Sequence, residues 1–241
     1  MIKSIGVLLT NTDRSDFAKR FDSDEVKFQK LLNPYRPDWK LSVIPVIDSI
    51  FPDVIDAHDA YIITGSPASV NDSHPWISKL YEFIRELHAH QRPTVGICFG
   101  HQAIANALGG KIASNPSGWS LGMEPTEFSA TLEWMQPTLS SLNLYSAHTE
   151  QVVKLPNSAT IIGTNKNCLN AAFVIGRHIM TTQYHPEMSL EFISNLVDHL
   201  QPNIAKDVFN IAHEQLNQPC DRELFAQWMI NFLEQSASHT A

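Results

Sequence analysis

Short apolar segments alternate with longer segments of helical periodicity over the first 110 residues of the chain. The apolar segments are bounded by turn-forming residues, as is typical of buried β-strands, and comprise Ile2–Leu9, Leu41–Ile47, Asp59–Thr64 and Val95–Cys98. Large apolar residues recur at helical spacing from Trp76 to Leu87, which predicts a helix over Trp76–His90 with one buried face. This alternation favours βαβ units and a parallel sheet that is covered by helices on both faces.

The pattern changes in the second half of the chain. From Lys111 to Arg177 no long helical pattern appears, and short apolar runs separated by turns predict extra strands, some of them antiparallel. Helical spacing returns in three segments, which are Leu190–Leu200, Ile204–Leu216 and Asp221–Gln235. Asp221 is the candidate N-cap of the last helix. We expect a single domain over residues 1–241, with C-terminal helices over about 189–236 and a disordered tail at 236–241.

Composition narrows the classes of function. The formal net charge is −8 and the Lys and Arg residues are scattered, which disfavours nonspecific binding to nucleic acid. No apolar run approaches the roughly 18–20 residues that span a bilayer, and no cleavage site follows the N-terminal apolar run, so neither a membrane segment nor a signal peptide is expected. Three cysteines do not make a disulfide framework and favour a reducing, cytoplasmic location. The eleven histidines form no HExxH motif and no paired CxxC motif is present, so we expect no metal and no cofactor.

One stretch carries a pattern that is typical of a catalytic turn. The segment PTVGICFGHQAIANALGG, from Pro93 to Gly110, predicts a buried strand that ends at Cys98, a turn at Phe99 and Gly100, and a helix to Leu108. The positive N-terminus of that helix would favour the thiolate of Cys98, which is the nucleophilic form. A buried, inert cysteine in a turn of small residues fits this stretch alone equally well.

A cysteine nucleophile needs a base and a group that orients the base. The segment TTQYHPEM offers His185 after a short predicted strand, and Glu187 two residues later on the same side of an extended chain. A reaction through an oxyanion also needs preorganised N–H donors. The amide of Phe99 is one candidate, and the turn at Gly65 after the third strand supplies another, although that turn also fits an ordinary strand exit.

Taken together, these segments resemble the class I (triad-type) glutamine amidotransferase family. GICFGHQ and QYHPE are similar to the two signature motifs of that family, and ITGSP is similar to its oxyanion turn. SAHTEQVVKLP is similar to a segment that contributes to the glutamine pocket, and KIASNPSGW with SLGM is similar to the stretch that follows the elbow helix. Two departures are AHTE, where the family has SHxD, and Ser117, where an acid often stands; they leave the identity of the γ-glutamyl substrate open.

The resemblance implies a three-layer αβα fold of flavodoxin-like type with a mostly parallel central sheet. It implies Cys98 as nucleophile, His185 as base and Glu187 as its orienting partner, with oxyanion amides from Gly65 and Phe99. It also implies a set of substrate contacts, namely Gly65, Ser66, Gln102, His148, Thr149, Glu150 and Gln151.

The sequence leaves three kinds of function open. The first is a glutaminase that releases ammonia for a separate synthetase chain. The nearest resemblance is to stand-alone family members that are similar to the glutaminase domain of GMP synthase. The second is a stand-alone hydrolase of γ-glutamyl peptides, because no phosphate-binding Gly-rich loop or second domain appears. The third is a non-catalytic binding or regulatory module on the same fold. We expect Cys168 and Cys220 to be passive thiols and His101 to be a buried structural residue.

Overall fold

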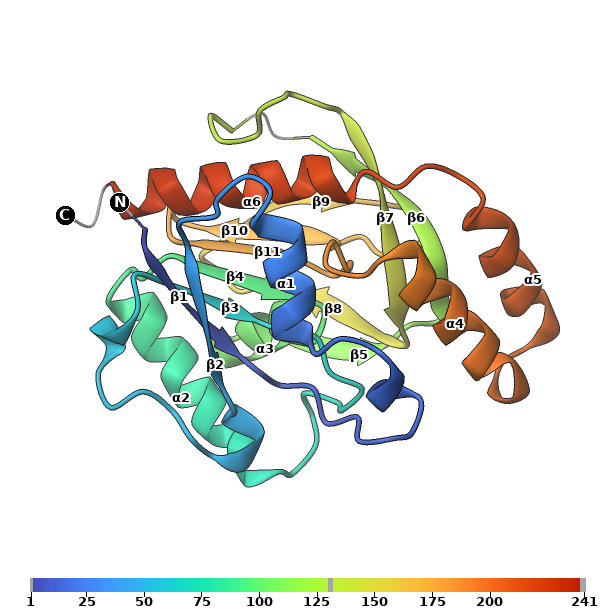
Figure 1. The fold of residues 1–241 in the computed structure, drawn as a ribbon, viewed down its shortest axis with the longest axis horizontal. Coiled ribbons are helices and arrows are strands. Elements are labelled where there is room, and N and C mark those ends of the chain that lie inside the picture. The colour runs from blue at the N-terminus through green and yellow to red at the C-terminus, as the bar shows by residue number, and fades with distance from the viewer. Residues whose placement is uncertain (1, 130–131, 239–241) are drawn as a thin grey trace.

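The central element of the computed structural model, which describes residues 2–129 and 132–238, is a twisted mixed sheet (Figure 1). Within the described residues the sheet has nine strands, and five neighbouring ones are parallel. In order across the sheet these are β2 (Lys40–Ile44), β1 (Ser4–Leu8), β3 (Ala60–Ile63), β4 (Thr94–Ile97) and β11 (Ile179–Thr182). The parallel core and its crossover helices confirm the fold class that the sequence predicted.

The antiparallel strands extend the sheet beyond β11. They are β10 (Ala172–Ile175), β9 (Ala159–Thr164), β6 (Ser120–Phe128) and β7 (Ser141–His148). A separate pair, β5 (Lys111–Ser114) and β8 (Glu150–Lys154), lies beside the elbow helix. The sequence indicated antiparallel strands in this region, but it did not locate β6 or β7.

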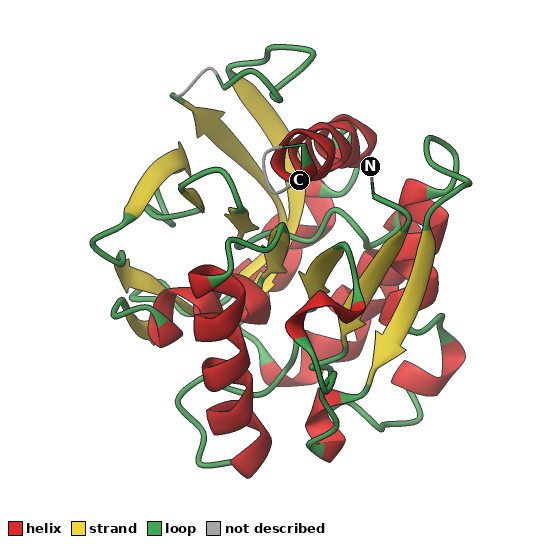
Figure 2. Cartoon of the chain, turned by 90° about the vertical axis from the view of Figure 1, so that its left-hand side faces the viewer, coloured by secondary structure: helices red, strands yellow, loops and turns green. Residues whose placement is uncertain are grey.

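Helices cover both faces of the parallel strands, as Figure 2 shows. On one face lie α1 (Asp24–Leu32) and α6 (Arg222–Ala237); on the other lie α2 (Pro75–Ala89) and α3 (Phe99–Ala107). Successive residues of a strand alternate between the two cores: Ile62 packs on the first face, whereas Tyr61 and Ile63 pack on the second. This double burial explains why the parallel strands are continuous apolar runs.

A third layer of packing lies beside β6 and β7. The helices α4 (Leu190–Leu200) and α5 (Lys206–Gln215) bury apolar residues against these two strands. The N-cap Ser189 accepts a hydrogen bond from the Phe192 amide and so fixes the start of α4. In Figure 1 these helices project beyond the end of the sheet.

The last helix differs from the sequence expectation at both ends. Asp221 precedes α6 as predicted, but its carboxylate accepts from the Asn143 amide at 2.8 Å and does not cap the helix. The helix also continues through Ala237, into the segment for which a disordered tail was predicted. Residues 239–241 of that segment lie outside the described residues.

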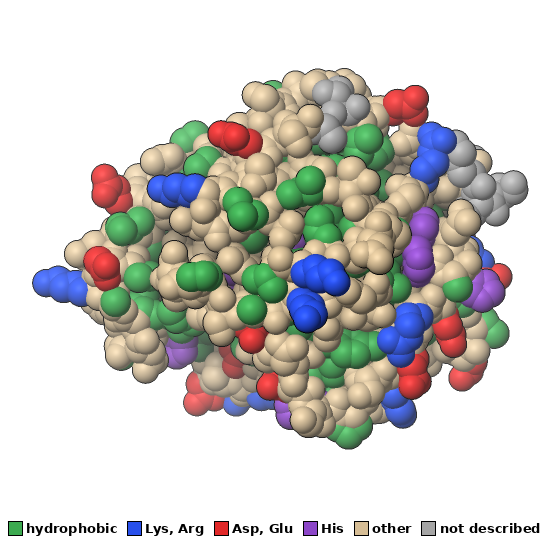
Figure 3. Space-filling model, turned by 180° about the vertical axis from the view of Figure 1, so that it is seen from behind, with side chains coloured by type: hydrophobic (Ala, Val, Ile, Leu, Met, Phe, Trp, Pro, Cys, Tyr) green, Lys and Arg blue, Asp and Glu red, His purple; other side chains and the backbone are tan. Residues whose placement is uncertain are grey.

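Acidic and basic side chains are interspersed over the face seen in Figure 3, in keeping with the scattered Lys and Arg of the sequence. No helix in the described part of the chain is long and apolar enough to cross a membrane.

Candidate active site

Cys98 lies at a strained turn between β4 and α3. Its backbone angles are φ 49° and ψ −101°, a conformation that side-chain-bearing residues rarely adopt. Backbone hydrogen bonds hold the turn: the Cys98 amide donates to the Thr182 carbonyl at 2.9 Å, and the Gly100 amide donates to the Thr64 carbonyl at 3.1 Å. The sequence placed the turn at Phe99 and Gly100, whereas the sharp bend is at Cys98 itself and the helix begins at Phe99.

Gly100 explains how α3 comes so close to the sheet. A Cβ atom at this position would lie 2.3 Å from the Ile63 carbonyl oxygen, a distance that no side chain tolerates. The first turn of the helix therefore packs directly against the end of β3. The Cys98 side chain, which is buried, is presented at the carboxyl ends of β3, β4 and β11, where ligands collect in parallel sheets.

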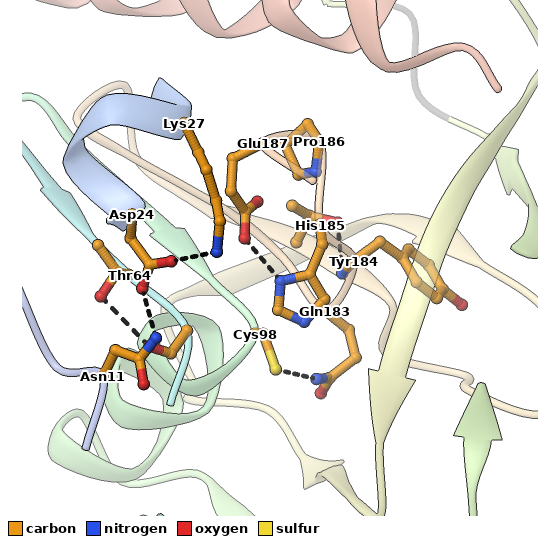
Figure 4. A network of polar contacts seen from close by, with 12 residues as sticks. Asn11, Asp24, Lys27, Thr64, Cys98, Gln183, Tyr184, His185, Pro186 and Glu187 are labelled. Carbon is orange, nitrogen blue, oxygen red and sulfur yellow. Dashed lines mark hydrogen bonds and ion pairs between the residues drawn. The ribbon is translucent and has the colours of Figure 1, made fainter. Parts of the chain in front are cut away.

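His185 and Glu187 form a buried pair beside Cys98 (Figure 4). His185 Nδ1 lies 2.7 Å from Glu187 Oε1. Burial lowers the pKa of His185, but the Glu187 carboxylate and the Cys98 sulfur outweigh this, so the pKa is raised above its ordinary value. His185 Nε2 has no hydrogen-bond partner among the described residues. The ring therefore has one nitrogen fixed by the carboxylate and the other free for a proton transfer.

Arg222 fixes the backbone of this pair, and no sequence pattern indicated this role. From the start of α6, its Nε donates to the Pro186 carbonyl at 3.0 Å and its Nη2 donates to the Glu187 carbonyl at 3.4 Å. The His185 amide donates to the Tyr145 carbonyl of β7 at 2.9 Å. The loop after β11 is thus held from two sides.

The Gly65 turn packs against both His185 and Cys98. A Cβ atom on Gly65 would lie 2.9 Å from His185 Cε1 and 3.7 Å from Cys98 Cβ. The Thr10 hydroxyl donates to the Gly65 carbonyl at 3.0 Å, which fixes the orientation of the turn. The amide N–H groups of Gly65 and Phe99 have no hydrogen-bond acceptor among residues 2–129 and 132–238. Both are therefore available to a ligand.

Gln102 lies behind Cys98 in a relay of side-chain amides. Its Nε2 donates to the Glu150 carbonyl at 2.8 Å and to Gln183 Oε1 at 3.0 Å. Gln183 Nε2 in turn donates to Cys98 Sγ at 3.5 Å. Gln102 has no free amide hydrogen for a substrate. Sequence reasoning missed Gln183, although its place two residues before His185, on the same side of an extended chain, was an available signal.

The remaining predicted contacts lie where β7 ends and β8 begins, and are His148, Thr149, Glu150 and Gln151. The His148 Nδ1–H donates to the Glu150 carbonyl at 3.0 Å, and burial lowers the pKa of His148 to about 4, so the ring is neutral at pH 7. The Thr149 carbonyl accepts from the Asn115 amide at 2.7 Å. None of these four residues lines the cavity in front of Cys98, whereas the preceding Ala147 does.

A cavity of 240 Å³ opens in front of Cys98 and His185. Its sheet-side wall, as we name it, consists of Gly65, Ser66, Cys98, His185 and Glu187. Its helix-side wall comprises Phe17, Asp24 and Lys27 from the region of α1, and Phe192, Leu196, His199 and Leu200 from α4. Trp119 and Met188 also line the space. Most of the helix-side wall is apolar, and Asp24 and Lys27 form an ion pair within it.

The other thiols lie apart from this cavity. Burial raises the pKa of the Cys168 thiol to about 12, and the partly buried Cys220 Sγ donates to the Asn143 carbonyl. His101 is fully buried, with Nδ1 2.8 Å from the Thr181 hydroxyl. In the described parts of the chain, no group of three or more His, Cys, Asp or Glu side chains is placed to hold a metal ion.

Comparisons with known proteins identify a family and a shared fold. Residues 38–194 match the family model described as glutamine amidotransferase class-I. Gamma-glutamyl peptidase 3 of Arabidopsis thaliana is 33% identical over 163 residues, which cover 64% of this chain and 66% of the relative. Gamma-glutamyl peptidase 4 of the same plant is 26% identical over 248 residues and covers 96% of each chain. The crystal structure of a glutamine amidotransferase from Thermotoga maritima superposes with a TM-score of 0.76 at 15% identity, covering 98% of this chain and 99% of the other, and shows a shared fold.

Proposed function

The chain belongs to the glutamine amidotransferase class-I family, and from this premise we propose that it hydrolyses γ-glutamyl amides through a thioester on Cys98. One observation carries the proposal: Cys98, His185 and Glu187 meet at neighbouring strand ends, at the wall of a cavity large enough for a substrate. The similarity to proteins named gamma-glutamyl peptidase supports the γ-glutamyl class of substrate.

Four residues of the sheet-side wall, together with Phe99, have roles in the proposed reaction. The Cys98 thiol transfers its proton to His185 Nε2, and Glu187 stabilises the imidazolium that forms. The sulfur attacks the γ-carbonyl carbon, and the oxygen, now negative, accepts hydrogen bonds from the Gly65 and Phe99 amides. The carbon–nitrogen bond then breaks, and the amine leaves with the proton from His185.

The second half of the proposed reaction regenerates the enzyme. Water transfers a proton to His185 and its oxygen attacks the thioester carbon, which again places negative charge on the oxygen between the two amides. The carbon–sulfur bond breaks, glutamate leaves, and the proton on His185 returns to the sulfur. Gln102 and Gln183 act as positioning residues in this scheme, because the Gln183 amide donates to the sulfur.

The test is glutamate release from glutamine and a panel of γ-glutamyl peptides by the wild type and by Cys98→Ala. We expect release by the wild type and none by the variant. 6-Diazo-5-oxo-L-norleucine should add covalently to Cys98, as seen by peptide mass spectrometry. The matched control is Cys220→Ala, which removes a partly buried thiol outside the cavity and should leave the adduct and the activity in place. A wild type that shows no adduct and no glutamate release would instead favour the non-catalytic module.

A separate synthetase chain that accepts ammonia is the other possible partner of this site. In that case glutamate release from glutamine is negligible for the isolated chain and rises on addition of a co-purifying synthetase. A chain that is fully active alone on γ-glutamyl peptides is a stand-alone hydrolase.

A further inference from the structure

The helix-side wall is larger and more apolar than the release of ammonia requires. Phe192, Leu196 and Leu200 face the cavity from α4, and Phe17 packs on Phe192 with ring centroids 6.0 Å apart. Phe21 packs edge-on against Phe192, with ring centroids 5.1 Å apart. Such a wall gains free energy from burying an apolar group, and ammonia has none to bury.

An ion pair interrupts this apolar wall. Lys27 Nζ lies 2.9 Å from Asp24 Oδ1, and the two side chains are only 10% and 8% exposed. The second carboxylate oxygen of Asp24 accepts from Asn11 Nδ2 at 3.0 Å. The Lys27 ammonium also lies over the Phe192 ring, 3.9 Å from its centroid. Figure 4 shows it at the tip of a side chain that extends from α1 toward the space beside Glu187 and His185.

The partners of this pair are unequal. Each Asp24 oxygen already accepts one hydrogen bond, from Lys27 or from Asn11. Lys27 carries three N–H donors, and among the described residues only Asp24 accepts from them. Because a buried ion pair contributes little or nothing to stability over an apolar replacement, its presence at a cavity wall calls for another reason. A spare, partly desolvated N–H donor suits the recognition of an anion.

The proposed reaction indicates which part of the substrate lies there. His185 must protonate the leaving nitrogen, so the leaving group lies on the side of His185 and Glu187. Met188 follows this pair directly, and α4 begins two residues later. Lys27 lies over Phe192 of the same helix. The apolar part of α4 and the Lys27 ammonium therefore border the leaving group and not the glutamyl group.

We infer that Lys27 binds the carboxylate of the leaving group, so that the preferred substrates are γ-glutamyl derivatives of apolar amino acids or short peptides with a free carboxylate. The inference rests on the proposed function for its assignment of the leaving side. Lys27 then determines specificity: it distinguishes an amino acid or peptide leaving group from ammonia and from uncharged amines.

The experiment compares γ-glutamyl-leucine with γ-glutamyl-leucinamide, which has the same size and lacks the carboxylate charge. For the wild type we expect kcat/KM, measured by glutamate release, to be about tenfold higher for the carboxylate substrate, in keeping with one charge-assisted hydrogen bond. In Lys27→Met, and in Asp24→Asn/Lys27→Met, which leaves no unpaired charge, the ratio should fall to about one. Lys27→Arg should keep the preference.

Lys30→Met is the matched control, because Lys30 lies on the same helix in an exposed ion pair with Asp22 and outside the cavity. This variant should keep the wild-type ratio. An unchanged ratio in the Lys27 variants overturns the inference. If kcat/KM also falls equally for both substrates, the result is the one expected when Asp24 and Lys27 bind the glutamyl group instead.

A binding measurement separates failure of the inference from failure of the proposed function. Calorimetry on Cys98→Ala should give about tenfold tighter binding of γ-glutamyl-leucine than of its carboxamide, and Cys98→Ala/Lys27→Met should not discriminate. Discrimination in binding without glutamate release by the wild type refutes the hydrolysis and keeps the carboxylate site. Glutamate release by the wild type without discrimination in binding refutes the carboxylate site and keeps the hydrolysis. No binding of either compound refutes both.

Discussion

The two walls of the cavity are built in different ways. The sheet-side wall is fixed by backbone hydrogen bonds. The Thr64 amide donates to the Leu8 carbonyl, the Cys98 amide to the Thr182 carbonyl and the His185 amide to the Tyr145 carbonyl. All three acceptors lie on strands of the sheet. The helix-side wall is fixed by side chains, through the rings of Phe17, Phe21, Phe192 and His199 and through the Asp24–Lys27 pair.

In the proposed function, this difference separates the residues that carry out the reaction from those that recognise the substrate. Proton transfer requires atoms held to within a fraction of an ångström, which adjoining strand ends supply. A wall of interlocking side chains on α1 and α4 can change its shape and charge without moving the strands. We therefore expect substitutions on the sheet-side wall to lower kcat and those on the helix-side wall to alter KM and substrate preference.

The largest expected effect comes from Glu187→Gln. This change keeps the size of the side chain but removes the charge that stabilises the His185 imidazolium and holds its tautomer. We expect kcat to fall by about ten-thousandfold, on the scale of amide replacements at the corresponding position of catalytic triads. Initial rates of glutamate release from γ-glutamyl-leucine measure it.

The comparison variant is Leu196→Ala on the helix-side wall. It removes the apolar contact proposed for the leaving group, so KM should rise by about tenfold or less while kcat changes little. Equal losses of kcat in Glu187→Gln and Leu196→Ala would contradict the division of roles between the two walls.

Gly65→Ala is expected to have the next largest effect. The added methyl group would lie 2.9 Å from His185 Cε1 and must displace the ring. We expect a loss of about 10- to 100-fold in kcat and about 1–3 kcal/mol in the free energy of unfolding, as for other overpacked sites. Urea unfolding gives the second quantity. In a His185→Ala background the stability cost should shrink; a cost of the same size would show that the methyl group clashes elsewhere.

The sequence predicts the sheet-side wall well because its residues follow from local rules. A short apolar run that ends at Cys98, a Gly-containing turn and a helix stop determine the elbow within one stretch of chain. The helix-side wall depends on α1 and α4, which are far apart in sequence, and no local pattern brings Lys27 to Phe192. Its residues were therefore missed.

The strands β6 and β7 escaped prediction for a related reason. Their buried positions include polar residues, because Ser120 and Ser146 hydrogen-bond to each other at 2.7 Å and Ser120 also donates to Glu124. Buried polar groups that satisfy one another across strands obscure the apolar alternation on which strand prediction depends.

Lowering the pH is expected to have a smaller effect, which is on the free energy of unfolding. Burial, with a contribution from His148, lowers the pKa of His101 to about 3, so the folded protein keeps this ring neutral while the unfolded chain protonates it near pH 6.5. The free energy of unfolding should therefore fall as the pH drops below about 6.5, by about 1 kcal/mol from His101 at pH 5.5. His185 acts in the opposite direction: its raised pKa contributes stability below pH 6.5 that is lost as the pH rises through that pKa.

Urea unfolding at pH 7.5 and pH 5.5 measures this contribution. The drop between the two values should be smaller in His101→Gln than in the wild type, whereas His90→Gln, which changes an exposed residue directly after α2, should show the full drop. The same drop in all three proteins would exclude His101 as a source of the stability that is lost at low pH.

Gln102→Leu should have the smallest effect on the reaction. It tests whether a residue behind the sheet-side wall acts on Cys98 through Gln183. The change deprives Gln183 and the Glu150 carbonyl of a donor but leaves the cavity lining unaltered. A positioning residue that acts through Gln183 should lower kcat by about three- to tenfold and leave KM unchanged, because only the placement of the sulfur is affected. The effect should also be non-additive with Gln183→Leu, since both changes break one relay. A rise in KM without loss of kcat, additive with Gln183→Leu, would instead show that Gln102 turns toward the substrate when it binds.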